Sequence, residues 1–318
     1  MADRRWTVTP LEQALNDYIK VRRRLGYQLR KPASLLRKFV EFLQAAGSSY
    51  ITTNLALRWA TQPCDAEPAC WGRRLGMVRQ FAIWYSAIEP RTEIPSSSLL
   101  PSRRRRKPPY IYSDEEVARI LSRTQQLQSS KGFRARTFTT LFGLMVATGM
   151  RVNEVVGLDR SDVDLDRGIL HIRKTKFRKS RYVPIHATTA AALRKYAAVR
   201  DRLFSAPSTP AFFISERGRR IPSDTAHYNF AKVSQQVGLR TPAKYHGRGP
   251  RLHDLRHRFA TRTLILWYRA GLDVERELPK LSTYLGHVHV TDTYWYLEAV
   301  PELLQLATER LSPREARP

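Results

Sequence analysis

Two arginines, two histidines and a tyrosine could together form a site in which a nucleophile attacks a phosphodiester. His253 and Arg256 lie three residues apart, so a helix would place an imidazole and a guanidinium on one face. His287 follows a Leu-Gly turn, and a tyrosine-rich segment that contains Tyr296 comes shortly after it. Upstream, Arg151 stands at a helix start marked by a glycine. The other elements of the chain must position these five side chains.

The chain carries a large excess of positive charge. It has 318 residues, with 55 Lys and Arg against 28 Asp and Glu, which gives a net charge of +27. Such a charge repels itself unless a polyanion neutralises it, so nucleic acid is the first expected partner and an anionic membrane surface the second. No apolar run approaches membrane-spanning length, no signal-peptide pattern opens the chain, and two cysteines are too few for a disulfide framework. The expectation is an intracellular, cytoplasmic protein that binds a polyanion without entering a membrane.

Residues 1–95 are predicted to form a helical DNA-binding domain. Apolar side chains recur at three-and-four spacing in several segments between residues 10 and 88, which is the pattern of amphipathic helices. One cluster of positive charge is usually a solvated helix face, but several clusters without acidic partners favour a surface that faces DNA. The basic residues assigned to that surface are Arg22, Arg23, Arg73 and Arg74.

Residues 96–110 are predicted to be a basic linker between two domains. Prolines and serines break the helical period there, and the like charges of Arg103, Arg104, Arg105 and Arg106 keep the segment extended along a strand of DNA. A second domain, residues 111–318, then begins at a capping box formed by Ser113 and Glu116.

The second domain is predicted to be mainly helical with a small antiparallel sheet. Its two strands, at 168–172 and 180–185, flank a loop with three lysines, and a further short strand is expected at 211–215. The predicted helices are 137–147, 151–158, 189–203, 224–237, 253–268, 278–285 and 291–297. A tail helix over 301–312 is predicted to carry a single apolar stripe of Val300, Leu303, Leu304, Ala307 and Leu311.

Five sequence boxes in this domain resemble those of the tyrosine recombinase (phage integrase) family. The resemblance covers residues 112–297 and is weaker over the helical N-terminal region, which is similar to the family's core-binding domain. The boxes are Ala-Thr-Gly-Met-Arg-Val-Asn-Glu at 147–154, the lysine-bearing hairpin at 174–181, His-Asp-Leu-Arg-His at 253–257, Leu-Gly-His at 285–287, and a tyrosine nine residues past that histidine.

The resemblance implies site-specific DNA strand exchange through a covalent phosphotyrosyl intermediate. Arg151 and Arg256 would offer planar forks of donors to the non-bridging oxygens of the phosphate, and His287 would add a further hydrogen bond. His253 would accept the proton of the tyrosine, whose ordinary pKa of about 10 disfavours unaided ionisation at neutral pH. Tyr296 is assigned as the nucleophile by the family's spacing.

The resemblance also assigns the hairpin lysines and one carboxylate. Lys176 matches the lysine that gives a proton to the leaving 5′-oxygen, whereas Lys174 and Lys179 are expected to contact DNA phosphates. Glu154 is expected to orient Arg151. Because religation uses the energy kept in the phosphotyrosine, no cofactor, metal or ATP is implied.

Helical geometry gives a separate argument about the two neighbouring tyrosines. Val290, Tyr294 and Leu297 stand at four-and-three spacing and are predicted to form a buried stripe. Tyr296 lies about 200° round the helix from Tyr294, so it is predicted to face away from that stripe and to be free to react. Tyr284 is expected to lie in the core.

The resemblance extends to assembly and biological role. It implies a C-shaped clamp of two domains around double-stranded DNA and a homotetramer in which the tail helix docks on the neighbouring protomer, although such a stripe usually packs on its own domain. A mobile-element recombinase in a bacterial nucleoid is the favoured role, with integrase, transposase and chromosome-dimer resolvase sharing the same chemistry. Partner recombinases or directionality factors would fit any of these.

Several other interpretations remain open on the sequence alone. Arg151 could simply pair with Glu154, and His253, His257 and His289 have spacings found among zinc ligands, although Arg256 beside them would oppose a cation. A type IB topoisomerase uses a similar set of residues without partner exchange. A non-catalytic DNA-binding regulator or a metal-dependent nuclease would belong to different functional classes.

Overall fold

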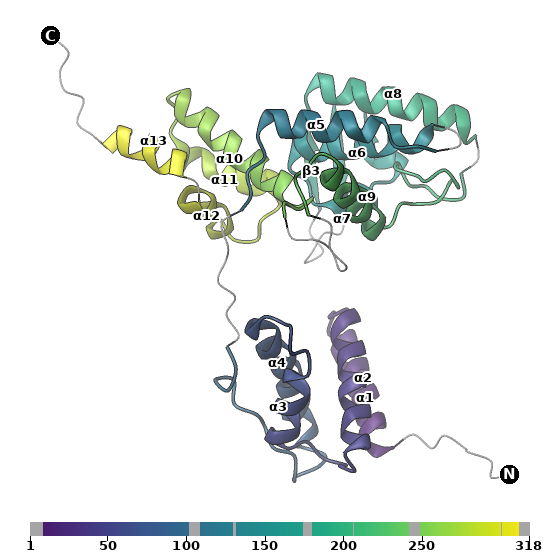
Figure 1. Ribbon diagram of the computed structural model, residues 1–318, viewed down its shortest axis with the longest axis vertical. Coiled ribbons are helices and arrows are strands. Elements are labelled where there is room, and N and C mark those ends of the chain that lie inside the picture. The colour runs from purple at the N-terminus through teal and green to yellow at the C-terminus, as the bar shows by residue number, and fades with distance from the viewer. Residues whose placement is uncertain are drawn as a thin grey trace. The chain divides into compact units, whose positions relative to one another are not determined.

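The computed structural model describes two compact units, which comprise Met1–Lys107 and Pro108–Pro318 (Figure 1). The described residues are 9–101, 109–129, 132–173, 180–205, 207–241, 249–299 and 301–311. Predicted functional residues outside these ranges are Arg103, Arg104, Arg105, Arg106, Lys174, Lys176 and Lys179. The same holds for Val300 and for the side chains of Ala307 and Leu311.

The N-terminal unit is built from helices that bury the predicted apolar stripes. In chain order they are α1 (Pro10–Arg24), α2 (Arg30–Ala45), α3 (Thr53–Thr61) and α4 (Pro68–Tyr85). Thr9 and Glu12 form a capping box that starts α1, and three arginines lie in its last turn, where cations favour the negative end of the helix dipole. Leu15, Phe39 and Phe81 are among the fully buried residues of this core.

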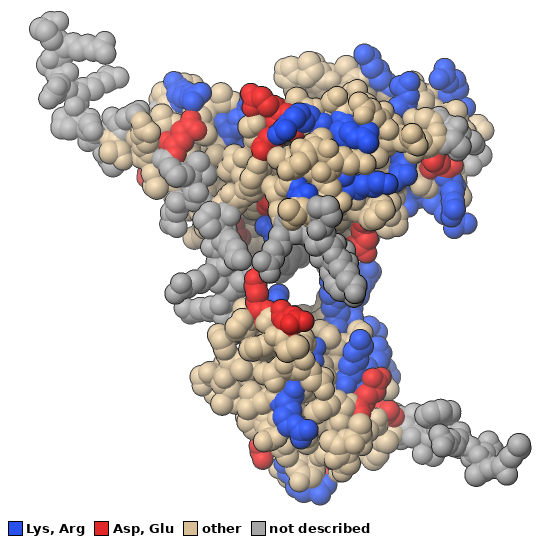
Figure 2. All heavy atoms as spheres, viewed as in Figure 1, with Lys and Arg blue, Asp and Glu red and all other residues tan. Residues whose placement is uncertain are grey.

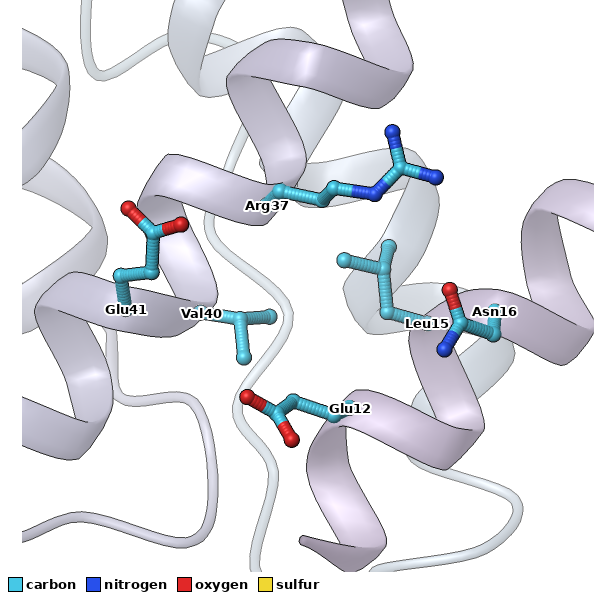
Figure 3. Close-up of a pocket in the computed structure, with 6 residues that line it drawn as sticks. All are labelled: Glu12, Leu15, Asn16, Arg37, Val40 and Glu41. Carbon is cyan, nitrogen blue, oxygen red and sulfur yellow. The ribbon is translucent and has the colours of Figure 1, made fainter. Parts of the chain in front are cut away.

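A hollow between α1 and α2 has a volume of about 210 Å³ (Figure 3). Its lining consists of Glu12, Leu15, Asn16, Arg37, Val40 and Glu41. None of these residues was a candidate for DNA binding, and the two carboxylates make the hollow unfavourable for a polyanion. The chemistry sought from the sequence therefore lies elsewhere.

The C-terminal unit contains a three-stranded antiparallel sheet among helices. The strands are β1 (Val163–Asp164), β2 (Ile169–Ile172) and β3 (Arg181–Pro184), in the order β1-β2-β3, with Leu170 opposite Val183. The helices are α5 (Asp114–Gln125), α6 (Phe133–Thr148), α7 (Val152–Gly157), α8 (Ala187–Leu203), α9 (Ser223–Gln236), α10 (Asp254–Arg269), α11 (Val274–Leu285), α12 (Thr291–Ala299) and α13 (Pro301–Leu311), with a 3-10 turn at Arg160–Asp162.

This architecture confirms the predicted fold class, which is mainly helical with one small antiparallel sheet. The capping box of Ser113 and Glu116 starts α5 as predicted. Buried side chains from α6, β2, β3 and α9 form the main core of the unit, with Phe142, Leu170 and Val183 fully enclosed. Within the described ranges, no helix is both long and apolar enough to cross a membrane.

Three of the predicted elements differ in the structure. Helix α6 begins at Phe133, four residues before the predicted Thr137. The segment 211–215 is not a strand but makes isolated bridges at Ala211 and Ile214, because its apolar side chains enter the core from a loop. Helix α11 begins four residues before the predicted Leu278, since the Asp273 side chain accepts a hydrogen bond from the Arg276 amide and caps it. The helix continues through Pro279.

The tail helix α13 forms as predicted. Of its predicted apolar stripe, only Leu303 and Leu304 have described side chains. Leu303 is 1% exposed and joins a core cluster with residues of α10, α11 and α12, whereas Leu304 is 51% exposed. The single stripe stays a prediction. In the single chain, α13 packs against α10 and α12 of its own unit, and an ion pair of 2.8 Å joins Arg269 to Glu302.

Gly149, which ends α6, offers a test of the close packing between α6 and α10. Its φ is +61°, and a Cβ added there would lie 2.6 Å from the ring of Phe259. Gly149→Ala is expected to lower the free energy of unfolding by about 2 to 4 kcal/mol, through left-handed strain and overpacking. Chemical denaturation of the full chain measures this change.

The matched control is Gly143→Ala in the same helix. A Cβ at Gly143 meets nothing within 4 Å. Alanine is the better helix former, so this change should raise stability by about 0.5 to 1 kcal/mol. Equal stability of the two variants would contradict a tight fit at Gly149.

Candidate active site

Four segments that are distant in the sequence meet at one site in the C-terminal unit. They are the corner between α6 and α7, the first turn of α10, the end of α11 and the middle of α12. These segments bring together Arg151, His253, Arg256, His287 and Tyr296, through contacts that link each to at least one other segment or ring. Of the six predicted catalytic residues, Lys176 lies outside the described residues.

Arg256 is deeply buried, with 2% of its surface exposed. Its two terminal nitrogens donate to the carbonyls of Gly149 at 2.9 Å and Leu285 at 2.7 Å. Burial, and then the positive charge of Arg151, lower its pKa to about 10, so the guanidinium remains charged at neutral pH. One arginine therefore ties α10 to both the α6 corner and the end of α11.

Arg151 precedes α7, and its guanidinium retains 32% of its exposure. It pairs with Glu154 at 3.0 Å and also donates to the Gly286 carbonyl at 3.3 Å. Arg151 is therefore paired with Glu154 and also reaches the shared site, and its catalytic role stays a prediction.

Arg181 is a site residue that the sequence did not indicate. Its terminal nitrogens donate to the two carboxylate oxygens of Glu154 at 3.1 and 2.9 Å, and its Nε donates to the Tyr284 carbonyl at 2.8 Å. Burial raises the pKa of Glu154, but hydrogen bonds and charge from Arg181 and Arg151 outweigh it, so the net shift is downward. Twenty-seven residues separate the two partners, and no short spacing could have connected them.

The end of α11 accepts hydrogen bonds from three arginines. Arg181, Arg256 and Arg151 donate to the successive carbonyls of residues 284, 285 and 286, where the helix dipole is negative. Gly286 ends the helix with φ +69°, and a Cβ there would lie 2.7 Å from a nitrogen of Arg181. Only glycine combines this backbone conformation with such a close approach.

Tyr296 is 3% exposed, whereas Tyr294 is 42% and Val290 38% exposed. The predicted buried stripe was therefore wrong, and Tyr296 lies on the buried face rather than opposite to it. The inward face of α12 also carries Thr293, which is 0% exposed and one turn before Tyr296. Counting only apolar side chains missed this face, because one of its members is a polar residue that hydrogen-bonds inside the site.

The partner of that threonine is His287. The His287 Nδ1 and the Thr293 hydroxyl are 2.7 Å apart, and the imidazole stacks on the Tyr296 ring with centroids 6.3 Å apart. Burial, and then the charges of Arg256 and Arg151, lower the pKa of His287 to about 4. The imidazole is therefore neutral at pH 7. When the Thr293 hydroxyl donates to Nδ1, the proton is on the other ring nitrogen, which can then donate elsewhere.

His253 and His257 lie one turn apart at the start of α10, with ring centroids 5.0 Å apart. Crowding by protein atoms, and then the charges of His257 and Arg256, lower the pKa of His253 to about 3, although the residue as a whole remains exposed. The His257 Nδ1 lies 3.3 Å from the Tyr296 hydroxyl. Within the described ranges no three His, Cys, Asp or Glu side chains are grouped to hold a metal ion.

The hydroxyl of Tyr296 sits among opposing influences. Burial raises its pKa, while the charge and hydrogen bonding of Arg256 and the charge of Arg151 lower it, and the net shift is upward. The phenol is therefore neutral in the DNA-free protein. This arrangement can hold an anion beside a hydroxyl nucleophile, provided that a neighbouring group removes the proton.

The predicted DNA-contacting arginines of the N-terminal unit differ in their exposure and in their contacts with other side chains. Arg23 and Arg73 are exposed, whereas Arg22 lies over the ring of Tyr27 and Arg74 lies over Trp59, at 4.0 and 3.7 Å from the centroids. Arg74 also donates to the Trp59 carbonyl at 2.7 Å. Lys and Arg side chains are spread over the visible faces of both units (Figure 2). Their roles in DNA binding stay predictions.

Comparison with known proteins identifies the family of the chain. Residues 111–302 match the model of the phage integrase family. An integrase/recombinase of Sinorhizobium fredii, y4rB, is 46% identical over 311 residues, which cover 96% of this chain and 98% of the relative. The tyrosine recombinase XerC of Chlorobaculum tepidum is 30% identical over 267 residues, which cover 78% of this chain and 74% of that protein.

Solved structures share the fold. The Tn1549 transposon integrase in complex with transposon right end DNA has a TM-score of 0.65 and 15% identity, covering 96% of this chain and 100% of that one. The XerH recombinase bound to difH in a post-cleavage complex has a TM-score of 0.63 and 19% identity, covering 88% and 77%. From the family match and the relatives that span nearly its whole length, the chain belongs to the phage integrase family of tyrosine recombinases.

Proposed function

We propose that the protein is a site-specific DNA recombinase that cleaves and rejoins strands through a covalent 3′-phosphotyrosyl intermediate. The observation that carries the proposal is the packing of the Tyr296 ring and hydroxyl beside Arg256, His257 and His287. A neutral, buried phenol next to fixed positive charge suits a nucleophile that becomes reactive once a phosphate is held against those charges.

Arginine, histidine, lysine and glutamate side chains act on the phosphate and on its leaving group. Arg151 and Arg256 stabilise negative charge on the non-bridging oxygens, and His287 adds a hydrogen bond from the nitrogen that Thr293 leaves free. Lys176 protonates the leaving 5′-oxygen, and Glu154 holds Arg151 in place. The reaction runs without metal or ATP, because the phosphotyrosine conserves the energy for religation.

The proposed biological role is integration, excision or transposition of a mobile element. The 46% identity to an integrase/recombinase over 98% of its length supports this role, as does the fold shared with a transposon integrase. Resolution of chromosome dimers is the second candidate, favoured by the 30% identity to XerC. A type IB topoisomerase would instead relax supercoiled DNA as a monomer without sequence preference.

The proposed active form is a homotetramer on DNA, with the N-terminal unit and the basic linker also contacting the duplex. The fold shared with a lambda integrase tetramer bound to a Holliday junction supports this assembly (TM-score 0.59, 17% identity). In the proposed tetramer of this protein, α13 of each protomer leaves its own unit and docks on a neighbouring protomer. Leu303 is buried against α10 in the single chain. In the tetramer it would occupy the equivalent position on the neighbouring protomer.

The covalent step is tested with nicked suicide duplexes made from sites selected by binding to the protein. Wild type is expected to form a 3′-phosphotyrosyl adduct that persists in EDTA, and Tyr296→Phe is expected to form none. Tyr294→Phe is the matched control, because Tyr294 is exposed and lies two residues away. Denaturing gels measure the adduct, and an adduct in Tyr296→Phe would falsify the assignment.

The role of the hairpin lysine is tested with a bridging 5′-thio substrate, whose leaving group needs no proton. Lys176→Ala should cleave ordinary DNA poorly and the thio substrate at nearly the wild-type rate. Arg151→Lys should stay defective on both, because it loses fork-shaped stabilisation of about 3 kcal/mol. If the thio substrate rescues Lys174→Ala or Lys179→Ala instead, the general acid is that lysine.

Tail exchange is tested by truncation after Ala299. The truncated protein should bind a single half-site normally but lose cooperative binding to a full site, because α13 no longer joins neighbours. Leu304→Glu in the full chain is the control that should keep half-site and cooperative binding, since Leu304 is exposed in the single chain. Gel shifts measure both properties, and undiminished cooperativity after truncation would show that α13 packs on its own unit.

A further inference from the structure

His257 has no role in the proposed chemistry, yet its ring is the one that meets the Tyr296 hydroxyl. Its Nδ1 lies 3.3 Å from that oxygen, and the ring centroids of the two residues are 5.5 Å apart. Catalytic hydrogen bonds are often long in the absence of substrate, so this distance suits a pair that tightens when DNA binds. Trp295 packs edge-on against the same imidazole at 5.4 Å and limits its movement.

The hydroxyl must lose its proton to a neighbour during attack. Its described partners are the His257 Nδ1 and the guanidinium of Arg256, and a guanidinium has no lone pair with which to accept a proton. His253, the base that the family resemblance implies, makes a T-shaped contact with the His257 ring and is exposed to solvent. Of the described hydrogen-bond partners of the Tyr296 hydroxyl, His257 is the one that offers an acceptor atom.

A carboxylate stands on the far side of this imidazole. Asp254 Oδ1 lies 3.8 Å from the His257 Nε2, and the Asp254 side chain is 3% exposed. The Arg251 amide donates to the other oxygen of Asp254 at 2.7 Å and fixes the carboxylate. Negative charge here favours the tautomer with its proton on Nε2, so that the Nδ1 lone pair faces the Tyr296 hydroxyl, and it stabilises the imidazolium that then forms.

Resting on the proposed function, we propose that His257 is the general base for Tyr296, with Asp254 as its positioning residue. As the Tyr296 oxygen forms its bond to phosphorus, its proton moves to the His257 Nδ1. The bond from phosphorus to the 5′-oxygen breaks, and that oxygen takes a proton from the hairpin lysine. In religation the 5′-hydroxyl attacks, and His257 returns the proton to the departing tyrosine oxygen.

The test compares the natural tyrosine at position 296 with 3,5-difluorotyrosine, whose phenol is more acidic and depends less on a base. With the natural tyrosine, His257→Gln is expected to slow cleavage of the suicide duplex by about 10²- to 10⁴-fold. With difluorotyrosine, the same substitution should cost less than about tenfold, because the phenolate forms without help. Single-turnover rates measure each cost as a ratio to the matching His257 protein.

Two matched variants make the outcome decisive. Arg151→Lys should be equally defective with either tyrosine, because it acts on phosphate charge. His253→Gln should likewise show no relief, and relief there in place of His257→Gln would overturn the proposal. A His257→Gln defect that is the same in both backgrounds would also overturn it and leave His257 a packing role.

Failure of the proposed function would look different. If wild type forms no adduct, or if Tyr296→Phe forms one, the recombinase assignment itself fails before His257 is considered. If wild type forms the adduct and His257→Gln cleaves at the wild-type rate, the recombinase stands and the base is another group. Thermal unfolding of His257→Gln verifies that the buried face of α12 remains packed.

Discussion

The end of α11 holds three guanidinium groups, and the site depends on this arrangement. Arg181, Arg256 and Arg151 come from a strand and from two different helix starts, and they donate to three consecutive carbonyls. Like charges so close together repel one another unless acceptors offset the repulsion. The carbonyls and the buried Glu154 carboxylate supply these acceptors, so the arginines are held in position before any phosphate arrives.

This constraint explains why two glycines stand where they do. The Gly149 carbonyl accepts from Arg256, and Gly286 lies against Arg181, and both residues have positive φ. A Cβ added at Gly149 would lie 2.6 Å from the Phe259 ring, and one added at Gly286 would lie 2.7 Å from an Arg181 nitrogen. The glycine of the Leu-Gly-His box is therefore a consequence of packing against Arg181, and that of the Thr-Gly-Met-Arg box a consequence of packing against Phe259, as much as signals of a turn.

Sequence patterns predicted those features of the structure that depend on neighbouring residues. The capping box at Ser113, the helical pairing of His253 with Arg256, and the antiparallel hairpin all depend on residues close together in the chain. Arg181 could not be found in this way, because its partner Glu154 belongs to another element. The burial of Tyr296 was missed for a related reason, since a polar Thr293 beside His287 replaces the apolar residue that periodicity seeks.

In the DNA-free protein, the charge states of His287 and Tyr296 are those of an unreactive site. Burial and the neighbouring arginines lower the pKa of His287, so its imidazole is neutral. At Tyr296, burial raises the pKa more than the arginines lower it, so the phenol is neutral as well. In the proposed chemistry, a phosphate held by Arg151 and Arg256 would partly neutralise them and would favour the charged form of a nearby histidine. Protonation of His257, the proposed base, would then become easier as Tyr296 gives up its proton. In that scheme, substrate binding and activation of the tyrosine are coupled through charge.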